Sequence, residues 1–166
     1  MADNRHHVDE ARTDAGKRIL DMTDAVGFDA HAAGWIHDRP TASWRYLLST
    51  PMLKSEGPLW IYSRLMKVFR HTPLPEGVSP LDIFVIDPDF EMALFGPSLM
   101  GRYVSPIKNP HLKVAILTLA QDIQFEDFAV TDGFVSFYRR LLPVERHRRH
   151  NPARTFDHKV KVLEAA

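Results

Sequence analysis

Residues 42–49 read Ala-Ser-Trp-Arg-Tyr-Leu-Leu-Ser, so that Ala, Trp, Tyr and Leu occupy every second position. A period of two with aromatic residues is typical of a strand with one buried face. A second stretch, Leu-Asp-Ile-Phe-Val-Ile at residues 81–86, is apolar at every position except one. Such a run predicts a strand buried on both faces. These two strands decide the fold class, and the other elements are assigned around them.

Two amphipathic helices are expected beside these strands. The first spans residues 5–27, ends at Gly27, and has an apolar stripe with steps of three and four residues. The second begins near the Ser-Glu-Gly-Pro signal at residues 55–58 and runs to Arg70. The first stripe contains two alanines, so it fits either a cover for the domain's own sheet or a contact with a second copy of the helix. Its members are Val8, Ala11, Ala15, Ile19, Met22 and Val26.

The second half of the chain is richer in strand and turn signals. The turn residues Asp-Pro-Asp at 87–89 predict a hairpin that continues into residues 90–95. Residues 96–110 are rich in glycine and proline and predict a long loop, and residues 112–119 predict another buried strand. Residues 132–142 fit either a strand or a helix, and the β-branched and aromatic residues favour the strand.

The fold class predicted from this order is α+β. We expect a mainly antiparallel sheet of about five or six strands, covered on one face by two helices. Residues 1–142 would form a single domain, which agrees with a total length of 166 residues. Residues 143–166 are polar and basic, and they predict a flexible C-terminal tail.

The composition excludes several classes of site. The chain has no cysteine, so it has no disulfide, no thiolate nucleophile and no cysteine-bound zinc. It has no apolar stretch of the length that a membrane helix needs, and its first residues do not resemble a secretory signal. We therefore expect a cytoplasmic protein that does not insert into a membrane.

The 21 basic and 21 acidic side chains cancel, but they are segregated along the chain. Residues 31–71 hold six basic and two acidic side chains, whereas residues 72–133 hold three and nine. Segregation of this kind favours self-neutralisation on folding, and it also permits weak, sequence-independent binding to nucleic acid. The candidate basic patch comprises Arg64, Lys67, Arg70, Arg139, Arg140, Arg146, Arg148 and Arg149.

An acidic group follows the predicted strand at residues 81–86 and consists of Asp87, Asp89 and Glu91. A fourth acidic residue, Asp82, lies within that strand. Carboxylates around a turn are ligands for Mg²⁺ or Ca²⁺, and a crowded pair also suits acid–base catalysis. The alternative is a solvated turn with acidic corners. The spacing of His147 and His150 does not amount to a metal site, and the sequence identifies no cofactor.

Aromatic residues provide a third candidate site. If the sheet is curved, Trp44, Tyr46 and Phe84 are placed to line a pocket for an apolar ligand. The same residues at the same spacing also fill an ordinary core.

The function favoured by these observations is a small binding, regulatory or assembly protein that acts through protein contacts, including self-association. One alternative is a small enzyme or ligand-binding domain with a pocket over a curved sheet. A second alternative is weakly specific nucleic-acid binding through the basic segments. The sequence leaves open whether the chain is an enzyme.

Overall fold

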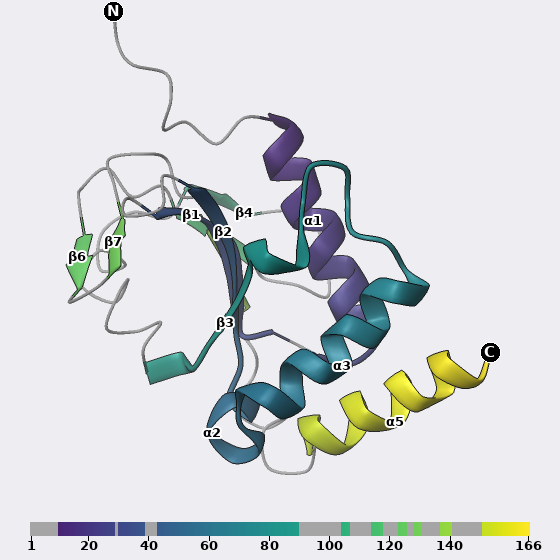
Figure 1. Cartoon of the computed structure of the whole chain (residues 1–166). Helices are drawn as coiled ribbons and strands as arrows, with labels where there is room; N and C mark the ends of the chain where they lie inside the picture. Colours follow the sequence, from purple (N-terminus) through teal and green to yellow (C-terminus); the bar gives the residue numbers. More distant parts are fainter. Residues whose placement is uncertain are drawn as a thin grey trace, which may run out of the picture.

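A computed structural model describes residues 10–28, 30–38, 43–89 and 151–166, together with the backbone of five further strands (Figure 1). The elements are α1 (Glu10–Ala25), β1 (Ala32–Asp38), β2 (Ser43–Ser49), α2 (Met52–Glu56), α3 (Pro58–His71), the 3-10 turn η2 (Pro80–Asp82), β3 (Ile83–Ile86), β4 (Val104–Pro106), β5 (Val114–Leu117), β6 (Ile123–Phe125), β7 (Phe128–Val130), β8 (Phe137–Arg140) and α5 (Pro152–Ala165).

Strands β2 and β3 are parallel neighbours, with Tyr46 opposite Ile83 and Ser49 opposite Ile86. Parallel neighbours need a long crossover, and α2 and α3 supply it. The predicted helix at residues 55–70 is thus confirmed in position, as α3, but its role in the topology differs from the prediction. It carries the chain from one strand to a parallel neighbour, whereas the turn signals favoured antiparallel hairpins.

The predicted mainly antiparallel sheet under two helices is wrong. Among the residues whose side chains the structure describes, strands β1, β2 and β3 form one mixed sheet, and four helices make up most of the remaining structure. No sequence pattern predicts strand β1, which is antiparallel to β2 along its whole length. Its Ala-Ala-Gly start has low strand propensity, but pairing on both edges, with β2 and with β8, overrides that propensity. The backbone order of the main path is β3-β2-β1-β8-β5-β4.

Helices α1, α3 and α5 lie on one side of β1–β3 (Figure 1). Ile19 of α1, Leu65 of α3 and Phe156 of α5 are fully buried in one apolar cluster with residues of the sheet. Burial of this kind stabilises each helix by roughly 1.5–3 kcal/mol per large side chain, more than helix propensity supplies. Of the stripe predicted for the first helix, Ala15, Ile19 and Val26 therefore face the protein's own core. Ala11 is exposed, and Val8 lies outside the described residues.

Helix α1 approaches the sheet closely at Gly16. The indole Nε1 of Trp35 donates to the carbonyl of Arg12 at 2.7 Å, and the hydroxyl of Tyr46 donates to the carbonyl of Gly16 at 2.6 Å. A Cβ atom at Gly16 would lie 2.7 Å from Trp35 Nε1 and 2.9 Å from the Tyr46 ring. The absence of a side chain at this position lets the two aromatic donors reach the helix backbone.

The structure differs from the prediction of a flexible tail at residues 152–165, which form α5. Asn151 caps this helix by accepting a hydrogen bond from the backbone N–H of Arg154 at 3.1 Å. Phe156 packs edge-on against Phe28 and Trp60, with ring centroids 5.3 and 6.1 Å apart. The apolar residues of this segment are few, but their helical spacing places them on one buried face. Residues 143–150 lie outside the described residues.

Candidate functional site

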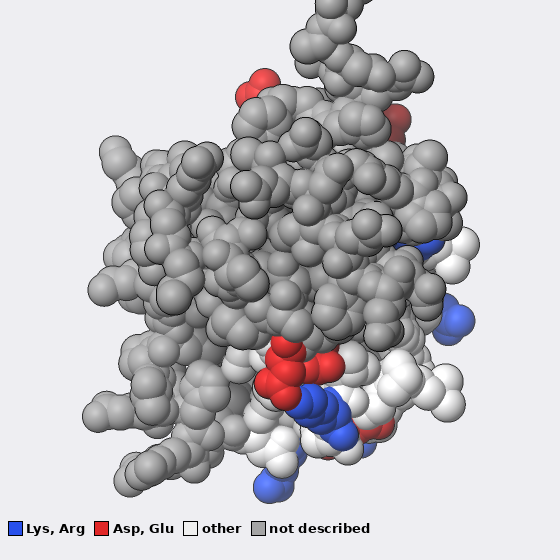
Figure 2. All heavy atoms as spheres, turned by 90° about the vertical axis from the view of Figure 1, so that its left-hand side faces the viewer, with Lys and Arg blue, Asp and Glu red and all other residues white. Residues whose placement is uncertain are grey.

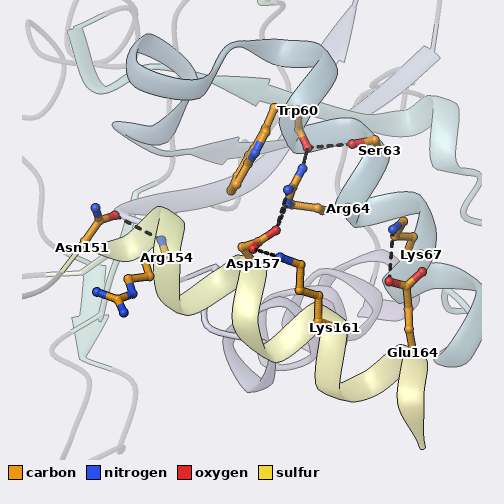
Figure 3. A network of polar contacts seen from close by, with 9 residues as sticks. All are labelled: Trp60, Ser63, Arg64, Lys67, Asn151, Arg154, Asp157, Lys161 and Glu164. Carbon is orange, nitrogen blue, oxygen red and sulfur yellow. Dashed lines mark hydrogen bonds and ion pairs between the residues drawn. The ribbon is translucent and has the colours of Figure 1, made fainter.

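Two of the three basic residues predicted on α3, Arg64 and Lys67, are paired with α5 (Figure 3). Both Arg64 Nε and Nη2 donate to Asp157 Oδ1, at 2.8 and 2.5 Å, while the guanidinium lies 3.6 Å from the centre of the Trp60 ring. Lys67 donates to Glu164 at 3.0 Å. Hydrogen bonds from Lys161 and Arg64 lower the pKa of Asp157 below its ordinary value.

The candidate basic patch is therefore partly self-neutralised, and the acids that neutralise it come from the C-terminal helix. Arg70 is exposed at the end of α3. Arg139 and Arg140 belong to strand β8, and Arg146, Arg148 and Arg149 lie outside the described residues. The structure thus does not gather these eight residues into one described surface.

The acidic group at residues 87–91 has a basic partner from α2. Lys54 forms ion pairs with Asp89 and, at 3.8 Å, with Asp87, while the backbone N–H of Asp89 donates to Asp87 at 2.8 Å. The hydrogen bond to Asp89 raises the pKa of Lys54. The ammonium group of Lys54 thus lies beside two of the carboxylates that were predicted to bind a metal ion. Glu91 lies outside the described residues.

The face drawn in Figure 2 likewise shows acidic and basic side chains directly against each other. Among the residues that the structure describes, no three histidine, aspartate or glutamate side chains converge as a metal site would require.

The predicted aromatic pocket is not formed as a unit. Tyr46 is fully buried beneath α1 and serves as a donor to the helix backbone. Phe84 alternates with the core residues Ile83 and Val85, so it lies on the opposite face of the sheet, 39% exposed. Trp44 is half-buried and does line a hollow. Of the three predicted ligand-binding residues, Trp44 alone is placed at this hollow.

The hollow has a volume of about 270 Å³ and lies between the first turns of α1, the sheet and the segment that leads into β3. The guanidinium carbon of Arg12 lies 4.9 Å from the centre of the Trp44 ring and 5.8 Å from that of Trp35. At such distances the cation is attracted by the ring face. The described residues that line it are Ala11, Arg12, Ala15, Trp35, Trp44, Glu76, Gly77, Val78 and Asp82.

The wall opposite α1 is fixed by a capping box at η2. Ser79 Oγ accepts from the backbone N–H of Leu81 at 3.0 Å, and Asp82 Oδ2 accepts from the backbone N–H of Ser79 at 2.8 Å. Gly77 takes a left-handed conformation, with φ of 77°, just before this turn. The hydroxyl of Tyr62 bridges the Ile83 carbonyl, at 3.4 Å, and the Val85 N–H, at 2.9 Å. The capping box thus fixes the turn itself, and the Tyr62 bonds hold β3 against α3.

Arg12 and the residues 76–78 at the hollow were not identified from the sequence. No periodicity links α1 with residues 76–82, because the two segments meet through the sheet. One local signal was present: Ser79 and Asp82 have the three-residue spacing of a capping box. That signal predicts the turn, and the hollow beside it requires the tertiary structure.

In the part of the chain that the structure describes, no helix is both long enough and apolar enough to span a bilayer. Comparison with known protein families, with curated proteins and with solved structures found no match to this chain.

Proposed function

We propose that the chain is a small protein-binding domain of the cytoplasm, and that it accepts one side chain of its partner in the hollow beside Trp44. The observation that carries this proposal is the half-buried Trp44 ring, stacked with Arg12 over an open hollow. Tryptophan and arginine are the residue types that dominate binding energy at protein interfaces. The cysteine-free sequence agrees with a reducing compartment.

The size of the hollow favours a side chain over a metabolite. Pockets for small molecules and cofactors commonly measure about 300–1,000 Å³. The hollow here measures about 270 Å³ and is open to solvent. That space suits one or two inserted side chains, with the rest of a partner lying across the rim. The exposed Ala11 and Glu76 at the rim leave room for such a partner.

Self-association through the stripe of α1 is a weaker candidate. Ala15 and Ile19, two members of the predicted stripe, are buried against the core of the same chain. A dimer through this face would require α1 to leave its sheet. The proposed partner is accordingly a different surface that contacts the hollow from outside.

A displayed library of short peptides tests the proposal on the full-length chain. Enriched peptides are expected to bind the unmodified chain at least about ten-fold more tightly than Ala11→Met, since the longer side chain at this exposed position would fill the hollow. The matched control is Ala25→Met, a substitution at an exposed position at the other end of α1. This variant should bind the peptides as the unmodified chain does.

Two outcomes would overturn the proposal. Either the enriched peptides bind Ala11→Met as tightly as the unmodified chain, or no peptide is enriched at all. Melting temperatures of the two variants by circular dichroism establish that both remain folded, so that a loss of binding refers to the hollow.

A further inference from the structure

We infer that the side chain accepted in the hollow is basic, with an apolar stem and a cationic end, as in lysine or arginine. This inference rests on the proposed function and adds the chemical class of the partner residue. It follows from the charges around the hollow, which include two carboxylates, Glu76 and Asp82, and one guanidinium, Arg12.

The positive charge in the lining is already placed against aromatic rings. Arg12 lies over Trp44 at 4.9 Å and over Trp35 at 5.8 Å, and its backbone carbonyl accepts from Trp35 Nε1. The first turns of α1 thus keep this cation on the tryptophan side of the hollow. The two carboxylates of the lining, Glu76 and Asp82, come from a different segment of the chain.

The two carboxylates lie in one short segment. Asp82 is held by the backbone N–H of Ser79, which uses one of its oxygens. A carboxylate has about four lone-pair directions, so Asp82 retains acceptor capacity. Glu76 is exposed in the same wall. Among the described residues of the lining, two carboxylates stand against one guanidinium, and this balance favours a cation over a carboxylate.

The lining also suits the stem of a basic side chain. Ala11, Ala15 and Val78 contribute apolar surface to the same hollow. Lysine and arginine place their methylene groups on such surface while the charged end reaches polar groups or water. A purely apolar side chain would form no ion pair with the carboxylates, and an acidic one would be repelled by them.

Three blocked amino acids probe this inference: N-acetyl-lysine amide, N-acetyl-norleucine amide and N-acetyl-glutamate amide. Norleucine has the unbranched stem of lysine without the ammonium group. Binding to the full chain is followed by NMR through the indole N–H signal of Trp44. The lysine amide is expected to bind about five-fold more tightly than the norleucine amide, as two partly exposed ion pairs allow. The glutamate amide is expected to bind most weakly.

Glu76→Gln should reduce the advantage of lysine over norleucine, because it removes one of the two carboxylates while leaving the exposed segment unchanged in size. Glu56→Gln, at an exposed position at the end of α2, is the matched control and should leave that advantage intact.

The outcomes separate the two proposals. If norleucine or glutamate binds as tightly as lysine, and Ala11→Met still abolishes the binding, the basic partner residue is wrong and the hollow remains a protein-binding site. If the lysine amide still binds more tightly than the norleucine amide to Glu76→Gln, and by the same factor, the role assigned to Glu76 is wrong. If no probe moves the Trp44 signal and the displayed peptides are insensitive to Ala11→Met, both proposals are wrong.

Discussion

Gly16 decides how close α1 lies to the sheet. Its carbonyl and that of Arg12, one turn earlier, accept hydrogen bonds from Tyr46 and Trp35. Both donors are buried side chains of the sheet, so each would lose its partner if the helix moved away. An unpaired buried donor costs about 1–3 kcal/mol. The same contact fixes Arg12 above the tryptophans that line the hollow.

We predict that Gly16→Ala destabilises the protein by about 1–2 kcal/mol. Glycine to alanine inside a helix ordinarily gains up to about 1 kcal/mol from helix propensity. Here the new methyl group would lie 2.7 Å from Trp35 Nε1 and 2.9 Å from Tyr46, and overpacking of this kind costs about 1–3 kcal/mol in addition to the strained hydrogen bonds. Urea denaturation measures the change, with Lys17→Ala at the adjacent exposed position as control. A stability equal to or above that of the unmodified protein would contradict the packing argument.

Helix α5 is the element whose contribution to stability differs most from the prediction, since its polar and basic sequence indicated a flexible tail. It joins α1 and α3, because Lys159 donates to the Ala25 carbonyl at 3.2 Å and Asp157 pairs with Arg64. The ion pairs are partly exposed and contribute little individually. The buried ring of Phe156, between Phe28 and Trp60, supplies most of the docking energy.

Phe156→Ala is expected to lower the free energy of unfolding by about 3–5 kcal/mol, the usual loss for a buried phenylalanine. Val162→Ala on the same helix, at a side chain 56% exposed, should change it by no more than about 0.5 kcal/mol. Guanidinium denaturation followed by circular dichroism measures both. Equal effects of the two substitutions would mean that α5 does not dock through the face described.

Across the whole molecule, the segregated charges of the sequence meet in space. Arg64 and Lys67 of the basic central segment pair with Asp157 and Glu164, almost one hundred residues later. The basic central segment is therefore partly neutralised within the chain, which is what the charge pattern favoured. The acids involved nevertheless belong to the C-terminal segment, whose net charge is positive.

The Asp157 pair makes part of the stability depend on pH. Its pKa in the folded protein lies below the value of about 3.9 that an aspartate has in an unfolded chain. The stabilisation is therefore complete above the unfolded pKa and is lost as the pH falls through the folded pKa. The difference in unfolding free energy between the unmodified protein and Asp157→Asn should stay constant from pH 7 to about 5 and shrink below about 4. A difference that persists unchanged to pH 2 would contradict this.

The sequence by itself determined where the strand at residues 43–49 and the helices α1 and α3 lie, because a local apolar period depends only on near neighbours. It did not determine the burial of that strand, since Leu47 is as fully buried as Tyr46 and Leu48 and the strand is not limited to one buried face. The tertiary structure alone decided the parallel pairing of β2 with β3, the strand β1, the docking of α5 and the hollow at Trp44. Each of these depends on residues far apart in the chain, whose meeting no local spacing encodes.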